Sequence, residues 1–239
     1  MSQPPPALLL TRPRAQAERF AADCRAVLGD AVRIVVSPVL SIVPRVVEAD
    51  LEGLAGVVLT SENGVGALAG LVLPKGSVAY CVGDRTAAAA EAAGVPAISA
   101  GGAVPDLVRL IRDAPPRGPL LYLRGTEVRG DLAGALAGAG VELRSAVAYE
   151  QVPCALTAEA RALLDGTAPV VAPLFSPRSA ALLGEAARGA AAPLRLAVLS
   201  PAVADAWTGP EPEILMVAQR PDASALMRTL ASIYTRKSP

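Results

Sequence analysis

The chain of 239 residues contains no histidine. Because histidine is the usual proton carrier near neutral pH, its absence excludes Ser-His-Asp and Cys-His hydrolysis, HExxH zinc chemistry and histidine proton shuttles. Any chemistry must therefore use a carboxylate, a tyrosine, a lysine, a hydroxyl or electrostatic stabilisation.

Cysteine is also scarce, with Cys24, Cys81 and Cys154 far apart in the sequence. This odd, dispersed set favours reduced thiols over a disulfide framework, and its spacing is not that of a metal site. We interpret Cys24 and Cys81 as core residues, and we expect neither a metal nor a cofactor.

The chain has no large charge excess and no long apolar run. Its 22 basic and 22 acidic residues form no basic block, so nucleic acid is not expected as a partner. No apolar stretch approaches the roughly 20 residues that span a bilayer, which argues against a membrane protein. The N-terminus lacks a cationic start and carries only a short apolar segment at 7–10, unlike a secretory signal. We expect a cytoplasmic protein.

The most informative feature present is a repeated transition from a short apolar run, through a small polar or proline-containing patch, to an alanine-rich helical pattern. A strand that feeds a helix in this way leaves backbone N–H groups free at the carboxyl edge of a sheet, where they can bind anions. The seven transitions are LLLTRPRAQ (8–16), VVLTSENGV (57–65), AYCVGDRTA (79–87), LLYLRGTEV (120–128), PLFSPRSAA (173–181), LAVLSPAVA (196–204) and LMVAQRPDA (215–223).

Hydrophobic periodicity predicts alternating strands and helices, which favours parallel sheets covered by helices on both faces. Two extended, proline-marked segments, 37–42 and 148–153, are the candidate domain boundaries. They also allow the first strand–helix–strand to join the C-terminal block. Strands are predicted at 7–10, 32–36, 57–59, 78–82, near 97, and at 120–123, 142–147, 170–175, 194–199 and 214–217, and helices at 15–28, 64–71, 86–93, 104–113, 129–139, 158–164 and 223–234.

Glycine motifs give no support for a nucleotide site. The segment from Asn63 to Gly70 has the spacing GxGxxxG, one residue longer than the dinucleotide fingerprint, and GxxxxGK[ST] does not occur. These glycines are better interpreted as allowing a tight turn and close packing of a helix on a sheet.

Polar residues at the helix starts have two interpretations. Capping alone explains each of them, but ligands of open α/β sheets also bind at the carboxyl ends of strands. Arginines outnumber lysines strongly beside these turns, a mild indication of carboxylate or phosphate binding. The polar residues are Thr11, Ser61, Asn63, Asp84, Thr86, Ser176 and Ser200, and the arginines are Arg12, Arg85, Arg124, Arg178 and Arg220.

Tyr149 is a further candidate because it lies in an extended crossing segment of a chain that is only 3% aromatic. There its side chain could face a cleft between domains. The alternative is an amphipathic residue at a domain boundary.

The order of these motifs resembles the uroporphyrinogen-III synthase family over residues 8–230. The resemblance is carried by LLLTRPRAQAERFAADC, SPVLSI, VVLTSENGVGAL, YCVGDRTAAAAEAAGV, LLYLRGTEVRGDLAGALAGAGVEL, AVAYEQVP, LFSPRSAALL, LAVLSPAVADAW and MVAQRPDASALMRTL. It implies an α/β fold of two parallel-sheet domains with flavodoxin- or Rossmann-like layers, joined by a two-stranded linker. The implied bounds are 1–38 and 153–239 for domain 1 and 42–147 for domain 2, with linkers at 37–42 and 148–153.

The resemblance also implies a reaction, namely cyclisation of hydroxymethylbilane to uroporphyrinogen III with inversion of ring D and loss of water. The implied enzyme is a monomer without cofactor or metal. Its substrate carries eight carboxylates, which helix starts on both sides of a cleft could bind.

Site residues follow from the same resemblance. Tyr149 matches the tyrosine proposed to assist departure of the hydroxyl, and Thr86 matches a threonine at a cleft-facing helix start, so these two are the predicted catalytic residues. Ser200 and Asp222 stand where many members have threonine and a Pro-Thr pair, which weakens the match at the last two turns. The predicted substrate-binding residues are Thr11, Arg12, Ser61, Asn63, Gly83, Arg124, Gly125, Ser176 and Ser200.

Two other function classes stay open from the residues alone. A nucleotide-sugar transferase with two Rossmann-like domains would share the alternating pattern, but lacks support from a fingerprint or from chain length. A non-catalytic hinge-bending module that binds a small anion would share the helix starts.

Overall fold

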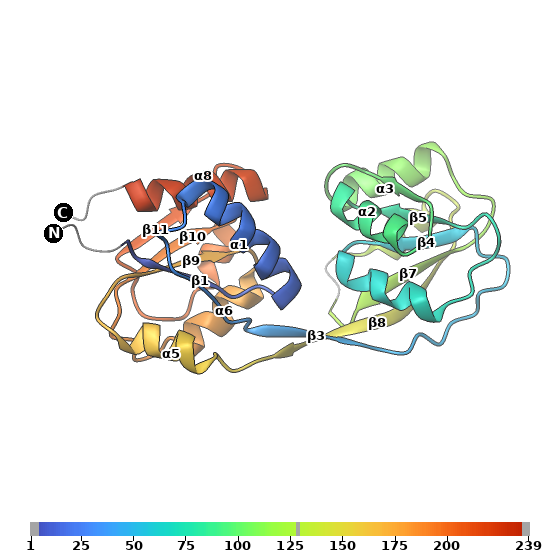
Figure 1. The fold of residues 1–239 in the computed structure, drawn as a ribbon. Helices are drawn as coiled ribbons and strands as arrows, with labels where there is room; N and C mark the ends of the chain where they lie inside the picture. The colour runs from blue at the N-terminus through green and yellow to red at the C-terminus, as the bar shows by residue number, and fades with distance from the viewer. Residues whose placement is uncertain (1–4, 128–129, 236–239) are drawn as a thin grey trace. The chain divides into compact units, whose positions relative to one another are not determined.

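The computed structural model describes residues 5–127 and 130–235, and the chain forms two compact units (Figure 1). Unit 1 comprises Met1–Ser41 and Val152–Pro239, and unit 2 comprises Ile42–Gln151. Unit 1 is therefore discontinuous in sequence, with unit 2 inserted between its second and third strands. Within the described ranges, no helix is long and apolar enough to cross a membrane.

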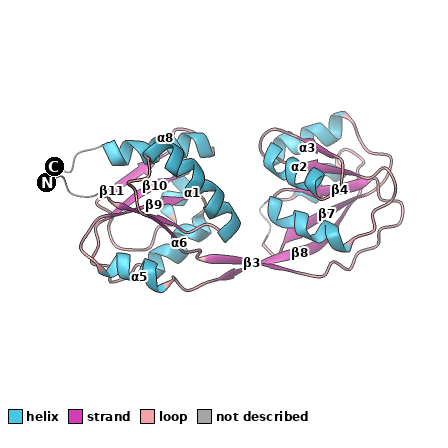
Figure 2. Cartoon of the chain, viewed as in Figure 1, coloured by secondary structure: helices cyan, strands magenta, loops and turns pink. Residues whose placement is uncertain are grey.

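Unit 1 contains a five-stranded sheet in its described part, in the order β11-β10-β9-β1-β2, with every recorded strand pair parallel. Helices cover both faces of this sheet, so its central strands are apolar on both sides (Figure 2). The elements are β1 (Ala7–Leu10), α1 (Arg14–Leu28), β2 (Ile34–Val36), α5 (Ala158–Asp165), β9 (Val170–Leu174), α6 (Pro177–Ala186), β10 (Leu194–Val198), α7 (Pro201–Asp205), β11 (Ile214–Val217) and α8 (Ala223–Thr235).

Alternation along β1 shows how the two faces are filled. Leu8 and Leu10 pack with α1 and α8, whereas Leu9 packs with α5, α6 and α7 on the opposite face. Successive strand residues point to opposite faces, so three consecutive leucines build two separate cores.

Unit 2 contains a six-stranded sheet in its described part, in the order β3-β8-β7-β4-β5-β6. One face packs against η1 and α2, and the other against α3 and α4. The elements are β3 (Leu40–Pro44), β4 (Gly56–Leu59), the 3-10 helix η1 (Glu62–Gly70), β5 (Val78–Cys81), α2 (Asp84–Ala92), β6 (Ala97–Ser99), α3 (Val104–Asp113), β7 (Leu120–Gly125), α4 (Leu132–Ala137) and β8 (Leu143–Pro153).

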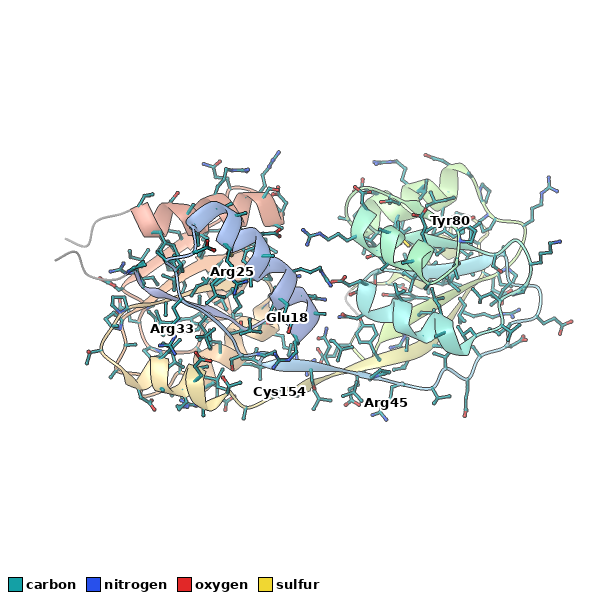
Figure 3. All side chains as sticks on the ribbon, viewed as in Figure 1. Glu18, Arg25, Arg33, Arg45, Tyr80 and Cys154 are labelled. Carbon is teal, nitrogen blue, oxygen red and sulfur yellow. The ribbon has the colours of Figure 1, made fainter. Side chains whose placement is uncertain are left out.

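Two strands, β3 and β8, carry the chain between the units. The Arg45 N–H donates to the Ala148 carbonyl at 2.9 Å, and the Cys154 N–H donates to the Val39 carbonyl at 2.9 Å, a pattern that makes the two strands antiparallel. The side chains of Arg45, labelled in Figure 3, and Glu150 form an ion pair across them.

The structure corrects several details of the sequence prediction. The strand expected to end at 147 continues through the expected linker segment at 148–153 as one strand, β8, and the extended segment expected at 37–42 contains the start of β3, which runs to Pro44. The helix expected at 64–71 is the 3-10 helix Glu62–Gly70. The helix expected at 129–139 is α4, Leu132–Ala137, and part of its expected start lies outside the described residues.

Candidate functional site

The strand order creates a switch point in each sheet. In unit 2 the chain proceeds outward from β4 to β5 and β6, then returns to β7 and β8 on the other side of β4. In unit 1 it proceeds from β1 to β2, and later from β9 to β10 and β11 in the opposite direction. Ligands of open α/β sheets bind beyond the carboxyl ends of strands at such points, here between β4 and β7 and between β1 and β9.

Four of the predicted site residues meet at the switch point of unit 2. Ser61 caps η1 directly after β4, and its Oγ accepts a hydrogen bond from the Asn63 N–H at 3.2 Å. The Tyr149 hydroxyl, contributed by β8, hydrogen-bonds with the side chains of Ser61 and Asn63. Gly125 ends β7 and lies against the ring of Tyr149. Residues from three segments far apart in sequence therefore surround one phenol.

The protonation of Tyr149 follows from this environment. The residue is only 8% exposed, and burial raises the pKa of its hydroxyl above 10.0, while the hydrogen bonds with Ser61 and Asn63 counteract part of that rise. The phenol is therefore protonated throughout the neutral range. It can donate a hydrogen bond, or a proton, to an oxygen that develops negative charge.

A second hydroxyl pair at the same end of the sheet was not found from the sequence. Thr60 Oγ1 and the Tyr122 hydroxyl are 2.9 Å apart. Thr60 follows the last residue of β4 and Tyr122 lies within β7, and neither was predicted as a site residue. Tyr122 also contributes to the raised pKa of Tyr149. The available signal was the scarcity of tyrosine, since four occur in the chain and two of them lie here.

The guanidinium of Arg124 is hydrogen-bonded to groups within unit 2. Its Nε donates to Ser145 Oγ at 2.7 Å, and Nη1 donates to the carbonyls of Gly125 and Thr126 at 3.0 and 3.4 Å. These hydrogen bonds hold the guanidinium against the end of β7 and connect it to β8. This arrangement gives a structural explanation for an arginine that we predicted as a substrate ligand.

The turn after β5 differs from expectation in the position of Thr86. Gly83, not Thr86, is the N-cap of α2, which begins at Asp84, and Thr86 lies inside the first turn with 8% of its surface exposed. Interpreting Thr86 as a helix cap was therefore wrong, although the residue lies in the first turn of the helix. Gly83 lies at the carboxyl end of β5, next to β4 in the sheet.

At the switch point of unit 1, the side chain of Arg12 packs on the ring of Phe175. The Arg12 guanidinium carbon lies 4.0 Å from the centre of the Phe175 ring, and Nη2 donates to Gln16 Oε1 at 3.2 Å. Phe175 in turn makes an edge-to-face contact with Phe20, with ring centres 5.0 Å apart. Both phenylalanines of the chain thus support one arginine, at the ends of β1 and β9.

The remaining predicted residues of unit 1 differ in whether they cap a helix. Ser176 caps α6, accepting from the Ser179 N–H at 3.2 Å and donating to Ser179 Oγ at 2.9 Å. Ser200 precedes the five-residue helix α7 but makes no side-chain cap bond. Thr11 is 1% exposed and Pro13 is the N-cap of α1, so the interpretation of Thr11 as a helix cap was wrong.

The described residues contain no metal-binding cluster, and two of the three cysteines are buried. No group of three or more histidine, cysteine, aspartate or glutamate side chains gathers there in a way that could hold a metal ion. Cys24 and Cys81 are buried and free, and burial raises their pKa values to about 12 and about 11, which keeps both as unreactive thiols at neutral pH.

Fold and site together define a protein of two α/β units, each with hydroxyl and amide groups at its switch point, and with a protonated tyrosine in unit 2. This places the chain among two-domain α/β proteins that lack a nucleotide-binding fingerprint.

Comparison with known proteins narrows this class to a family. The family model described as uroporphyrinogen-III synthase HemD matches residues 21–228, so the chain belongs to the uroporphyrinogen-III synthase family, the cyclising lyases of tetrapyrrole biosynthesis. The two-domain α/β fold expected from the sequence is confirmed. Comparison with curated proteins gave no significant match.

Two solved structures show the same fold. The chain is 15% identical to uroporphyrinogen-III synthetase from Helicobacter pylori, with a TM-score of 0.64, covering 95% of this chain and 99% of that one. It is 18% identical to a mutant uroporphyrinogen III synthase from the extremely thermophilic bacterium Thermus thermophilus, with a TM-score of 0.50, covering 95% and 97%. At these identities the likeness concerns the fold, and the roles of single residues rest on the geometry above.

Proposed function

We propose that this chain cyclises hydroxymethylbilane to uroporphyrinogen III and that Tyr149 assists departure of the substrate hydroxyl. Family membership supports the reaction, and the environment of Tyr149 supports the role of this residue. The observation that carries the second part is a buried, protonated phenol hydrogen-bonded with Ser61 and Asn63 at a switch point.

The chemical step is loss of water from the hydroxymethyl carbon. The C–O bond breaks, the phenol donates a hydrogen bond or proton to the departing oxygen, and an azafulvene forms on ring A. The substituted carbon of ring D then attacks this centre to form a spiro intermediate. The bond from that carbon to its original methylene group breaks, the methylene group bonds to the unsubstituted α carbon of ring D, and the proton lost from that carbon replaces the one given up by the phenol. Donation at the leaving oxygen lowers the barrier because it stabilises charge that appears only in the transition state.

Substrate binding uses the carboxylates. We propose that Arg12 and the start of α6 at Ser176 bind carboxylates in unit 1, and that the turns at Gly83 and Ser61 bind them in unit 2. Arginine suits this task because its planar guanidinium pairs with both oxygens of a carboxylate. Helix starts add backbone N–H donors and a partial positive charge.

The same proposal includes a cytoplasmic monomer. Three free cysteines, two of them buried, fit a reducing compartment. Analytical ultracentrifugation at assay concentration tests the monomer, and a dimer at micromolar concentration would contradict it.

An isomer assay tests the reaction. Hydroxymethylbilane is generated enzymatically, the products are oxidised and the type I and type III uroporphyrins are separated by chromatography. We expect type III in excess of the spontaneous type I product. Type I alone, formed at the spontaneous rate by a protein shown to be folded, would refute the proposed function.

A further inference from the structure

An irregularity in β8 lies directly beside Tyr149. Strand partners from Leu120 with Leu143 to Arg124 with Val147 keep one spacing, but Gly125 is paired with Tyr149, one residue further on. The Thr126 N–H donates to the Tyr149 carbonyl at 3.1 Å, and the Ala148 carbonyl faces β3 instead. Strand β8 therefore contains one extra residue at this point, a β-bulge.

The bulge changes the face on which Tyr149 lies. Before it, Leu143 packs with the core that faces α3 and α4, whereas Ala146 packs with the core that faces η1 and α2. Strict alternation would place Tyr149, six residues after Leu143, on the same face as Leu143. Tyr149 instead packs in the core with Ala146, on the face of η1. Only on this face can its hydroxyl meet Ser61 and Asn63.

Gly125 leaves the space that the reoriented ring occupies. A Cβ atom at position 125 would lie 2.9 Å from Tyr149 Cε2, 3.0 Å from Cζ and 3.3 Å from the hydroxyl oxygen. These distances are shorter than ordinary carbon contacts. Gly125 does not have a positive φ, so an alanine there would strain the contact with Tyr149 and not the backbone.

We infer that Gly125 and the bulge in β8 together aim the Tyr149 hydroxyl at Ser61 and Asn63, which makes Gly125 a positioning residue for the leaving-group step. This inference rests on the proposed function for its effect on rate. It assigns Gly125 a role through Tyr149, in contrast to the direct substrate contact predicted from the sequence. A glycine is needed because every other side chain would displace the phenol.

The first test compares Gly125→Ala with the control Gly70→Ala. Gly70 also lies in unit 2 without a positive φ, and a Cβ there would meet nothing within 4 Å. We expect Gly125→Ala to lower kcat for the type III product about tenfold or more with KM changed less than about twofold, because a misplacement below 1 Å disturbs the reacting geometry. The control should retain the parent kcat.

A double-mutant comparison separates positioning from general damage to the fold. In the Tyr149→Phe background the ring remains but the hydroxyl is gone, so Gly125→Ala should lower kcat less than about twofold further. An equal loss in both backgrounds would overturn the inference, because Gly125 would then act independently of the hydroxyl.

Tyrosine NMR gives a readout that does not need turnover. The chain has four tyrosines, and in protein labelled with 13C-tyrosine the ring signal of Tyr149 is the one lost in Tyr149→Phe. Gly125→Ala should shift this signal and leave those of Tyr80 and Tyr234 in place. An unchanged Tyr149 signal in folded Gly125→Ala would overturn the positioning role, even if the isomer assay supports the reaction. A shifted Tyr149 signal combined with full activity of Tyr149→Phe would support positioning and refute the catalytic role of the phenol.

Discussion

Replacing Tyr149 by phenylalanine is the most direct probe of the site. The substitution removes one oxygen from a residue that is 8% exposed and leaves the ring in its core. Ser61 and Asn63 lose a partner, while the cost of burying the hydroxyl disappears. The two effects oppose each other, so we expect a net loss of about 1 kcal/mol in the free energy of unfolding, or about 2–4 °C in Tm.

The effect on rate should be larger than the effect on stability. Proton or hydrogen-bond donation by a placed side chain contributes about 100-fold or more, and a labile leaving group needs less help. We therefore expect kcat for the type III product to fall about 10- to 100-fold, equivalent to about 1.4–2.7 kcal/mol in the activation free energy. KM should stay close to the parent value, because the hydroxyl acts on the leaving oxygen and not on a carboxylate.

The pH dependence has a defined sign. Burial raises the pKa of Tyr149 above its ordinary value, so the donor is protonated at neutral pH and is lost only at alkaline pH. The contribution of Tyr149 to kcat should thus be flat through the neutral range and fall only at strongly alkaline pH. In Tyr149→Phe the alkaline fall that belongs to this group should be absent.

The assay is the timed conversion of hydroxymethylbilane, with oxidation and separation of isomers, alongside thermal unfolding. Tyr80→Phe is the matched control, because Tyr80, labelled in Figure 3, is another partly buried tyrosine of unit 2 but packs against the core of the opposite face. A type III rate in Tyr149→Phe within twofold of the parent would refute the catalytic role. An equal fall in Tyr80→Phe would show that the loss is not specific to the site.

Three further predictions concern other parts of the chain. Phe175→Leu removes the ring beneath Arg12 and should raise KM about two- to fivefold with kcat unchanged in steady-state kinetics, the range of an exposed cation–π contact; an unchanged KM would exclude this support. Gly64→Ala would place a Cβ 2.8 Å from the Leu123 carbonyl oxygen and should cost about 1–3 kcal/mol in urea unfolding; parent stability would contradict the close approach. Burial raises the pKa of Cys24 from 9.0 to about 12, so its contribution to stability is complete below pH 9 and is lost between pH 9 and 12, by at most about 4 kcal/mol; Cys24→Ala should flatten that alkaline loss in urea titrations, and an unchanged slope would contradict it.

Much of the site could be located from the sequence because it depends on strand ends. Ser61 and Ser176 lie within two residues of the end of an apolar run, and both are N-caps in the structure. Capping joins residues two or three positions apart, so it can be inferred from local sequence. The same reasoning gave a wrong prediction for Thr11. Pro13, two residues later, is the N-cap, and Thr11 is buried.

Pairings between distant segments could not be inferred in this way. The platform of Phe20 and Phe175 beneath Arg12 joins residues more than 150 positions apart, and no local period connects them. Arg124 looked equivalent to Arg12 in sequence, yet its guanidinium is taken up by Ser145 and two carbonyls. The difference lies in the neighbouring strand, which sequence spacing does not identify.

The sequence by itself determined the alternating strands and helices, the exclusion of histidine chemistry and the family resemblance, because these depend on composition, short periods and the order of motifs. Tertiary structure alone decided the strand order that creates each switch point and the bulge that turns Tyr149 toward Ser61 and Asn63. Side chains alternate with a period of two along a strand, so one extra residue reverses the face of everything after it. The bulge and the space that Gly125 leaves for the Tyr149 ring both involve the neighbouring strand β7, so these contacts exist only once the sheet has assembled.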